Sequence, residues 1–267
     1  MSDRLRKYLL YSLGLCSIVL HLVLSDRIGR ESFFSHAFFF WSVALLLLTQ
    51  KQLKFKSDRI SAFIGGILLS FVLYKSLHLF PEDYFLRIAP LLSLFGWGLI
   101  ASGVKGIKQY FQEIFILSFL AVPWELVYLW DISPITARLS HFILWLFGFE
   151  AVRQGVWLVL PTGSVEVYSG CSGVKVMLQL LGLSWIVLAV VKTNWKLKLL
   201  LPTAAILLGF LVNGFRVALM AILVALSDSV GFDYWHTGTG SLIFSGVAVL
   251  LFGFACWLTI PKESVSL

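Results

Sequence analysis

Three side chains in the second half of the chain could carry out chemistry on a carbonyl group. Cys171 lies in the glycine-flanked segment 169–173, Arg216 inside a later apolar run, and His236 where the last apolar run begins. A cysteine can attack a carbonyl carbon, a histidine can take the thiol proton and later protonate a leaving amine, and a cation can stabilise the oxyanion formed between those steps. These residue types predict nucleophilic catalysis if the fold brings them together.

The elements that must position these side chains are membrane-spanning helices. Of the 267 residues, 59% are hydrophobic and 13% are charged, which is more apolar than a water-soluble domain of this size needs. Runs of about 20 apolar residues match the thickness of a bilayer and must be helical, because lipid offers the backbone no hydrogen-bond partner. We therefore expect an all-α polytopic membrane protein with about eight transmembrane helices. Their expected ranges are residues 8–24, 33–49, 60–77, 88–104, 111–130, 173–191, 199–226 and 237–260.

The basic residues predict how these helices are oriented. Counted loop by loop, thirteen Lys and Arg residues fall on one side of the predicted spans and six on the other. The positive-inside bias then places both termini in the cytoplasm and residues 131–172 and 227–236 outside the plasma membrane. The first span ends without a small-x-small cleavage pattern, so we interpret it as a retained anchor.

The chain is expected to form a single integral membrane domain over residues 1–267. Four N-terminal spans occupy residues 1–110, and the candidate catalytic residues fall in a core at 111–260. The net charge of +7 is spread over several loops and forms no single patch, which argues against a nucleic-acid partner. The lipid bilayer is the partner that the composition indicates, and the sequence leaves the oligomeric state open.

The stretch before the candidate cysteine predicts two small elements outside the bilayer. A Ser-Pro pair precedes residues 135–149, whose apolar and polar side chains follow helical spacing, so we expect an amphipathic helix on the outer membrane surface. Residues 156–160 and 165–168 are rich in β-branched and aromatic side chains and flank a Pro/Gly turn, which predicts a β-hairpin. Because its second strand leads to Cys171, its edge could hold an extended substrate peptide.

Cys171 differs from the other two cysteines in its surroundings. Cys16 and Cys256 lie inside apolar runs, where a free thiol acts as a small hydrophobic side chain. We expect the next helix to begin near Ser172 or Gly173, so that its N-terminal dipole favours the thiolate form of Cys171. Lys175, four residues on, either adds to that effect or extends its charged end to the membrane interface. A packing role in a tight turn is the alternative for Cys171.

Arg216 is a charged residue within a predicted span, and such residues are functional or paired with an opposite charge. Asn213, three residues earlier, lies on the same helical face and supports the site. A catalytic Arg216 would stabilise a tetrahedral intermediate, whereas a structural Arg216 would pair with Glu125 or Glu166.

His236 follows an outward loop, with Asp228 and Asp233 nearby as possible orienting carboxylates. The alternative for His236 is a structural role at the membrane interface. The thiol and the cation predicted on the same side favour the catalytic role. The sequence contains no H-E-x-x-H motif and no Cys/His cluster with zinc spacing, so we expect neither a metal site nor an organic cofactor.

Three motifs taken together resemble those of the exosortase and archaeosortase family. They are Gly170-Cys171-Ser172-Gly173 at the start of one helix, Asn213-x-x-Arg216 in the next, and His236-x-x-x-Gly240 at the start of the last. The approach to the cysteine at residues 161–167 is similar to that of the cyanobacterial branch. The resemblance is strongest over residues 120–250.

The resemblance implies a multipass membrane enzyme that recognises a C-terminal sorting signal on secreted proteins. That signal consists of Pro-Glu-Pro, a transmembrane helix and a basic tail. Carried over to this chain, Cys171 would be the nucleophile, Arg216 the oxyanion stabiliser and His236 the acid and base. Archaeal members of the family have arginine at the third position. The role that the resemblance assigns to His236 is therefore the first of the three to test. The resemblance leaves open whether hydrolysis or transpeptidation follows cleavage.

Two other functions fit part of the same sequence. The G-x-S-G pattern at residues 170–173 also resembles that of rhomboid serine proteases, which would make Ser172 the nucleophile and His236 its base. A transporter would instead use Arg216 and Glu125 near the middle of the membrane. Arg216 lies about 15 Å before the expected helix end at residue 226, a depth that an early helix end near Ala221 would reduce.

Overall fold

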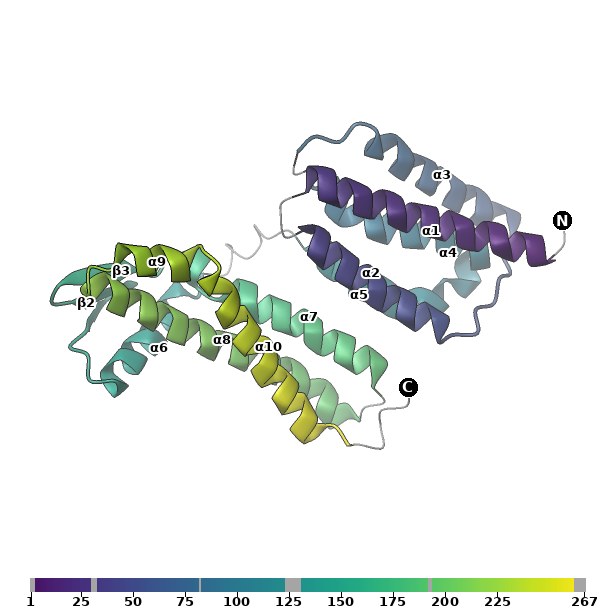
Figure 1. The fold of residues 1–267 in the computed structure, drawn as a ribbon. Coiled ribbons are helices and arrows are strands. Elements are labelled where there is room, and N and C mark those ends of the chain that lie inside the picture. Colours follow the sequence, from purple (N-terminus) through teal and green to yellow (C-terminus); the bar gives the residue numbers. More distant parts are fainter. Residues whose placement is uncertain (1–2, 30–32, 82, 123–130, 192–193, 262–267) are drawn as a thin grey trace. The chain divides into compact units, whose positions relative to one another are not determined.

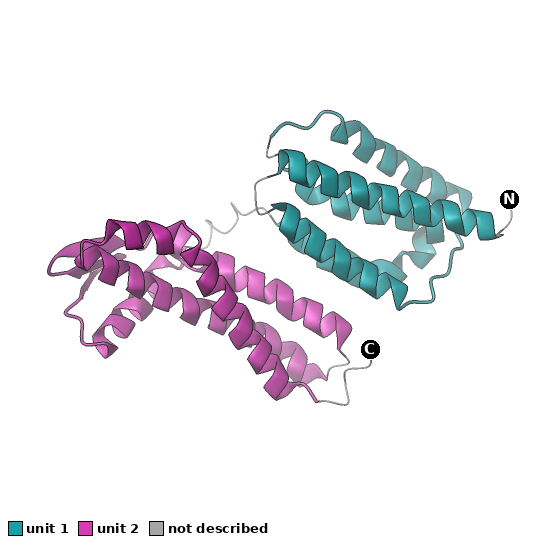
Figure 2. Cartoon of the chain, viewed as in Figure 1, with its two compact units in different colours: residues 1–123 teal, residues 124–267 magenta. Residues whose placement is uncertain are grey.

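The computed structural model describes residues 3–29, 33–81, 83–122, 131–191 and 194–261. It is mostly helical and divides into two compact units, residues 1–123 and 124–267, which are coloured separately in Figure 2. All the candidate catalytic residues belong to the second unit. Each unit has its own buried core, so each is described by itself.

The first unit is a bundle of helices around aromatic side chains. Its helices are α1 (Asp3–Ile28), α2 (Phe33–Thr49), α3 (Arg59–Ser76), α4 (Phe85–Gly106) and α5 (Phe111–Ala121), with the 3-10 helix η1 (Ile107–Tyr110) before the last (Figure 1). Trp41, Trp97 and Tyr110 are the largest buried rings in the core. Helix α4 packs against α1, α3 and α5, and α2 packs against α1 and α5.

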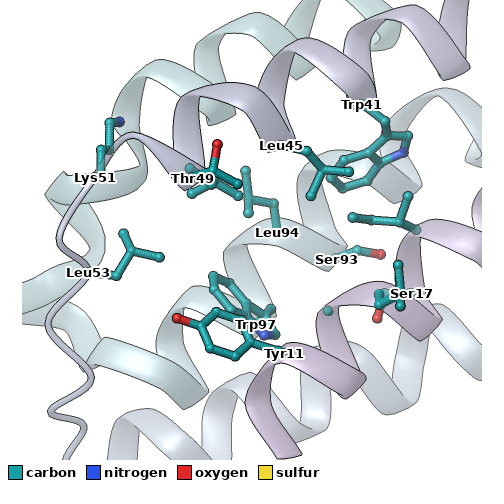
Figure 3. A pocket seen from close by; sticks show the side chains of 14 residues that line it. Tyr11, Ser17, Trp41, Leu45, Thr49, Lys51, Leu53, Ser93, Leu94 and Trp97 are labelled. Atoms are coloured by element: carbon teal, nitrogen blue, oxygen red, sulfur yellow. The ribbon is translucent and has the colours of Figure 1, made fainter. Parts of the chain in front are cut away.

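A mainly apolar cavity of about 390 Å³ lies between α1, α2 and α4 (Figure 3). Tyr11 and Trp97 line one part of the cavity, and Trp41 and Leu45 line another. Lys51, which follows α2 in the chain, also lines it. The residues that line this cavity belong to the first unit, and none of them is a candidate catalytic residue.

Six described helical segments are long and apolar enough to cross a membrane, and the expected number of eight is not confirmed. Helix α2 has 17 residues and a length of about 26 Å, slightly less than the hydrocarbon core of a bilayer. The predicted span 88–104 and residues 111–121 of the predicted span 111–130 lie in one helical stretch, Phe85–Ala121, which Gly103 interrupts with a positive φ of 67°. Part of the second range lies outside the described residues.

The second unit contains the remaining helices and a small sheet. These elements are α6 (Ser133–Leu146), β1 (Val152–Gln154), β2 (Trp157–Leu160), β3 (Gly163–Glu166), the 3-10 helix η3 (Ser169–Cys171), α7 (Val174–Val190), α8 (Trp195–Ala225), α9 (Ser229–His236) and α10 (Gly240–Thr259). The sheet is antiparallel in the order β1-β2-β3. Figure 1 shows α7, α8 and α10 side by side, and all three pairs are in contact.

Helix α8 belongs to two packing environments. Its first part, around Leu201, Ala205 and Val212, is buried against α7 and α10. Its last part, from Val217 to Ala221, is buried against α6 and the sheet. With 31 residues α8 is about 46 Å long, which exceeds the roughly 30 Å hydrocarbon core, so one or both ends must extend beyond it.

The helix ends at Ala225, close to the expected end at residue 226, and the early end near Ala221 that would have reduced the depth of Arg216 does not occur. The helix continues to Ala225 because α6 and the strands give its last turns an apolar surface to pack against. Arg216 lies at the boundary between the two packing environments. The last turns of α8 pack on α6 and the sheet, so the distance from Arg216 to the end of the helix is not a measure of how deep Arg216 lies in the bilayer.

Both small elements predicted before the cysteine are present. The hairpin is confirmed as β2 and β3, with Leu160 opposite Gly163 across a two-residue turn, and β1 adds a strand that the sequence pattern did not predict. The predicted amphipathic helix is α6. Its buried side includes Ser133, Thr136 and Ser140.

The aromatic side chains of α6 are exposed, among them Phe142 and Trp145. The buried side combines the apolar side chains of Ala137, Ile143 and Leu144 with hydroxyl groups that hydrogen-bond to backbone carbonyls of α8 and of the cysteine turn. Placement of α6 at the membrane surface stays a prediction.

Candidate active site

Cys171 ends the 3-10 turn η3 and precedes α7 without belonging to it. Its N–H donates to the Tyr168 carbonyl at 2.8 Å, and the Ser172 hydroxyl donates to the Ser169 carbonyl at 2.6 Å. Helix α7 begins at Val174, with Gly173 as its N-cap, so the cysteine is slightly farther from the first helical turn than expected. The turn leaves Cys171 half-buried while Ser172 is buried.

Gly173 and Asn213 fix the backbone of this turn. Gly173 has φ of 94°, a left-handed conformation that glycine adopts without strain. A Cβ added there would lie only 2.7 Å from Nδ2 of Asn213. That same amide nitrogen donates to the Cys171 carbonyl at 2.9 Å. Asn213 therefore holds the cysteine turn against α8, which gives the predicted supporting residue a specific contact.

Thr136 is a further contact to the turn that sequence reasoning missed. Its hydroxyl, on the buried face of α6, donates to the Ser172 carbonyl at 2.7 Å. Ser140, one helical turn on, donates to the Gly214 carbonyl at 3.0 Å. The signal in the sequence was a row of hydroxyl residues at helical spacing, 133, 136 and 140, on one helix.

The chain after α8 folds back and so returns His236 to the cysteine. Ser227 has φ of 56°, and the N–H groups of Ser227 and Asp228 donate to the carbonyls of Val224 and Leu223. This is a Schellman ending with serine in the usual glycine position. Asp228 then caps α9 by accepting from the Gly231 N–H at 2.8 Å. Asp228 is thus a helix cap, and none of its hydrogen bonds within the described ranges reaches the imidazole.

The imidazole of His236 lies beside the thiol. The distance between Sγ of Cys171 and Nε2 of His236 is 3.4 Å. The ring also stacks at a tilt on Phe232, with 5.0 Å between the centroids. A thiol and an imidazole at this distance can exchange a proton directly.

Arg216 contacts the same histidine through its backbone. Nη2 of Arg216 donates to the carbonyl oxygen of His236 at 2.8 Å, whereas its Nε is buried and has no hydrogen-bond partner among the described residues. Among the described residues Arg216 forms no ion pair. Glu166 is exposed on β3, and Glu125 lies outside the part of the chain that the structure describes.

The surroundings of His236 favour its neutral form. Burial lowers the pKa of His236 below the ordinary value of 6.5, and the positive charge of Arg216 lowers it further. Asp233, whose side chain is exposed one turn earlier, acts in the opposite direction and raises this pKa. The imidazole is therefore uncharged at pH 7 and free to accept a proton.

The remaining candidate positions lie at the edge of this group. Lys175 is exposed on the first turn of α7. Across the described ranges, no three His, Cys, Asp or Glu side chains are placed so that they could hold a metal ion. The structure thus brings together the thiol from the turn before α7, the imidazole from α9 and the guanidinium from α8.

The sequence model of one family, described as "Transmembrane exosortase (Exosortase_EpsH)", matches residues 28–253. This range covers most of the chain and contains Cys171, Arg216 and His236. No curated protein and no solved structure matches the chain.

Proposed function

The chain belongs to the transmembrane exosortase family, and we propose that it is a cysteine peptidase or transpeptidase acting at the outer face of the plasma membrane. Membership indicates a membrane enzyme that processes sorting signals. The proposed substrates are secreted proteins that end in Pro-Glu-Pro, a transmembrane helix and a basic tail. The resemblance of residues 161–167 favours the cyanobacterial branch of the family.

The distance of 3.4 Å between the Cys171 thiol and the His236 imidazole carries this proposal. In the first step His236 Nε2 takes the thiol proton and the sulfur attacks the scissile carbonyl carbon, which becomes tetrahedral. Collapse of this intermediate breaks the C–N bond, and His236 gives the proton to the leaving amine. The resulting thioester is then cleaved by water or by the nucleophile of an acceptor.

Arg216 supports both of these steps. Its contact with the His236 carbonyl positions the imidazole beside the thiol. Its buried Nε is a donor without an acceptor, which is costly unless an acceptor arrives during the reaction. We propose that the oxyanion of the tetrahedral intermediate takes this place, as in other preorganised oxyanion sites. Arg216 is then a catalytic residue, and Asn213 positions the nucleophile through the cysteine turn.

The contacts of Ser172 favour Cys171 as the nucleophile over the rhomboid-like alternative. The Ser172 hydroxyl is buried and donates within its own turn to the Ser169 carbonyl at 2.6 Å. Cys171 is half-buried, and its sulfur is the atom within reach of His236. The transporter alternative also loses support, because Arg216 contacts the backbone of His236.

The length of α8 fits the proposed orientation. If both termini are cytoplasmic, the end of α8 and the loop to α9 lie outside the membrane together with α6 and the sheet. The last turns of α8 pack on those same elements. The catalytic core, proposed at residues 111–260, then has its reactive side chains near the outer interface.

Processing of a signal-bearing reporter by single variants of the full-length enzyme in liposomes tests the proposal. We expect Cys171→Ala to lower the rate about a thousandfold or more, because the nucleophile is lost. Ser172→Ala should retain activity within about tenfold, reflecting only the loss of one turn-stabilising hydrogen bond. Cys16→Ala is the matched control for loss of a thiol, since Cys16 is exposed in the first unit. An inactive Ser172→Ala beside an active Cys171→Ala would refute the assignment.

A further inference from the structure

The sheet beside the cysteine has one edge whose hydrogen-bonding groups point away from the other strands. Val167 donates to the Val156 carbonyl at 3.0 Å, which fixes these two residues as a hydrogen-bonded pair. Because such pairs alternate along an antiparallel ladder, Leu158–Val165 is also hydrogen-bonded and Trp157–Glu166 is not. The N–H and C=O groups of Glu166, and by the same alternation those of Ser164, therefore point outward from β3.

This outward edge is open within the described part of the chain. No hydrogen bond among the described residues involves the backbone N–H or C=O of Ser164 or Glu166. Both side chains are exposed as well. Helix α8 packs on β3 near the hairpin tip, where Gly163 meets Val224, and Thr162 donates its hydroxyl to the Ala225 carbonyl. The strand is thus held in place by α8 while its outer edge is left unpaired.

The edge is also continuous with the candidate nucleophile. Only Val167 and Tyr168 separate β3 from η3, which ends at Cys171. Val167 is fully buried, so the connection is anchored. A chain paired with β3 would lie about 4.8 Å from it and would lead toward the thiol.

We propose that the outward edge of β3, defined by Ser164 and Glu166, binds the extended segment of the substrate that precedes the scissile bond. This inference rests on the proposed function and adds how the substrate is held. Main-chain hydrogen bonds to an exposed strand edge are a general way to bind an extended peptide. A substrate held in this way presents successive carbonyls at fixed spacing, which aligns one of them with the cysteine.

The order of elements sets the direction of the bound segment. In this chain an outer strand leads to Cys171 and then to the membrane helix α7. The proposed substrate likewise passes from an outer segment through the scissile bond into its own transmembrane helix. The two chains therefore run parallel, and Ser164 and Glu166 would pair with alternate residues of the substrate.

This pairing also has a consequence for the proposed Pro-Glu-Pro signal. Proline has no N–H, and an edge strand accepts it where the missing N–H would face away from its neighbour. The Glu of the signal would then direct its N–H toward β3, with both prolines on the outer side.

Two proline variants on opposite edges of the sheet test the inference from the side of the enzyme. Glu166→Pro removes an outward N–H on β3 and no hydrogen bond to β2. Arg153→Pro does the same on the outer edge of β1, the other edge strand of the sheet, because the pair Arg153–Leu158 is also not hydrogen-bonded. Glu166→Ala and Arg153→Ala report the loss of each side chain alone.

We expect kcat/KM for the signal-bearing reporter to fall about fivefold or more from Glu166→Ala to Glu166→Pro. From Arg153→Ala to Arg153→Pro it should stay within about twofold, because that edge does not lead to Cys171. Equal losses in both pairs would overturn the inference, as would no loss in either pair. Melting temperatures identify any variant that has not folded.

Esters in the backbone of a synthetic substrate give a second test that leaves the enzyme unchanged. The probe is a single-span peptide with Pro-Glu-Pro, an apolar helix of about 20 residues and a basic tail. Replacing one amide at a time by an ester removes one N–H. Losses of kcat/KM at every second position, with the Glu among the sensitive ones, would support strand pairing. Uniform tolerance would overturn this inference but not the proposed function, which fails only if the all-amide probe is not cleaved in a Cys171-dependent manner.

Discussion

Each unit of the molecule contains a histidine in contact with a second segment of the chain and a cationic side chain that contacts a backbone carbonyl. The two units differ in which hydrogen-bond partners these side chains have. In the first unit, Nε2 of His21 contacts the Leu86 carbonyl at 2.8 Å, and the Trp41 indole donates to Nδ1 at 3.1 Å. Lys51 forms an ion pair with the buried Glu113 at 2.7 Å and donates to the Gln109 carbonyl. These polar groups have their partners within the unit.

In the second unit the corresponding groups keep reactive atoms available. His236 uses Nε2 to face a thiol, and Arg216 has one donor on a carbonyl and one buried donor without a partner. Polar groups with all partners supplied by their own helices stabilise a fold. Groups with a partner still missing are suited to a substrate. The comparison therefore sets His21 and Lys51, whose contacts lie within the first unit, against Arg216, which keeps one buried donor unpaired among the described residues.

The two histidines provide the largest expected difference. His236→Ala should lower the processing rate by about 10²–10⁴-fold with little change in melting temperature, because it removes the proton carrier. His21→Ala should destabilise the protein by about 1–3 kcal/mol, because it leaves the Trp41 indole N–H and the Leu86 carbonyl without a partner. Its rate per folded molecule should change little. Parallel measurement of rate and thermal unfolding separates the two effects, and a stable, inactive His21→Ala would break the comparison.

The two cations give the next largest effect. Arg216→Gln should reduce kcat about 10²–10³-fold, in the range found when a single oxyanion donor is removed. Lys51→Ala should instead cost about 3 kcal/mol or more of stability, because Glu113 would remain buried without its counter-charge. Single-turnover kinetics measure the first change and denaturant unfolding the second. If Arg216→Gln lost only stability, Arg216 would belong with Lys51 as a structural cation.

A smaller effect is expected on the pH dependence of the reaction. Neutral His236 is the reactive form, and its pKa is lowered by burial and by Arg216, so the rate should fall only as the pH decreases through a value below 6.5. Asp233→Asn removes the charge that raises this pKa and should move the acid limb to still lower pH. Asp228→Asn keeps the helix cap and should leave the limb in place. Profiles of kcat/KM against pH for the three enzymes check the direction of each shift.

Residue chemistry and turn signals were enough to predict several parts of the site. A cysteine between glycines, a charge inside an apolar run and a histidine at an interface are each unusual, so Cys171, Arg216 and His236 could be singled out without a structure. The Pro/Gly turn and its β-branched flanks likewise predicted the hairpin of β2 and β3.

Features that depend on tertiary contacts could not be predicted in this way. Thr136 is recognisable only once α6 is seen to turn its hydroxyl face toward the cysteine turn. The return of α9 depends on Ser227, which adopts a backbone conformation that usually indicates glycine. The number of spans is not confirmed, because apolar runs do not show where one helix ends and the next begins: residues 88–104 and the start of the run at 111 share one helical stretch, Phe85–Ala121.

The most direct test of the central claim is to identify the atom that carries the acyl group during turnover. Full-length enzyme would be mixed with the signal-bearing substrate, quenched in acid within one turnover, digested and analysed by mass spectrometry. The account predicts a hydroxylamine-sensitive thioester on Cys171 in the wild-type enzyme, with no acyl-enzyme in Cys171→Ala. An acyl group on Ser172, or continued processing by Cys171→Ala, would contradict it.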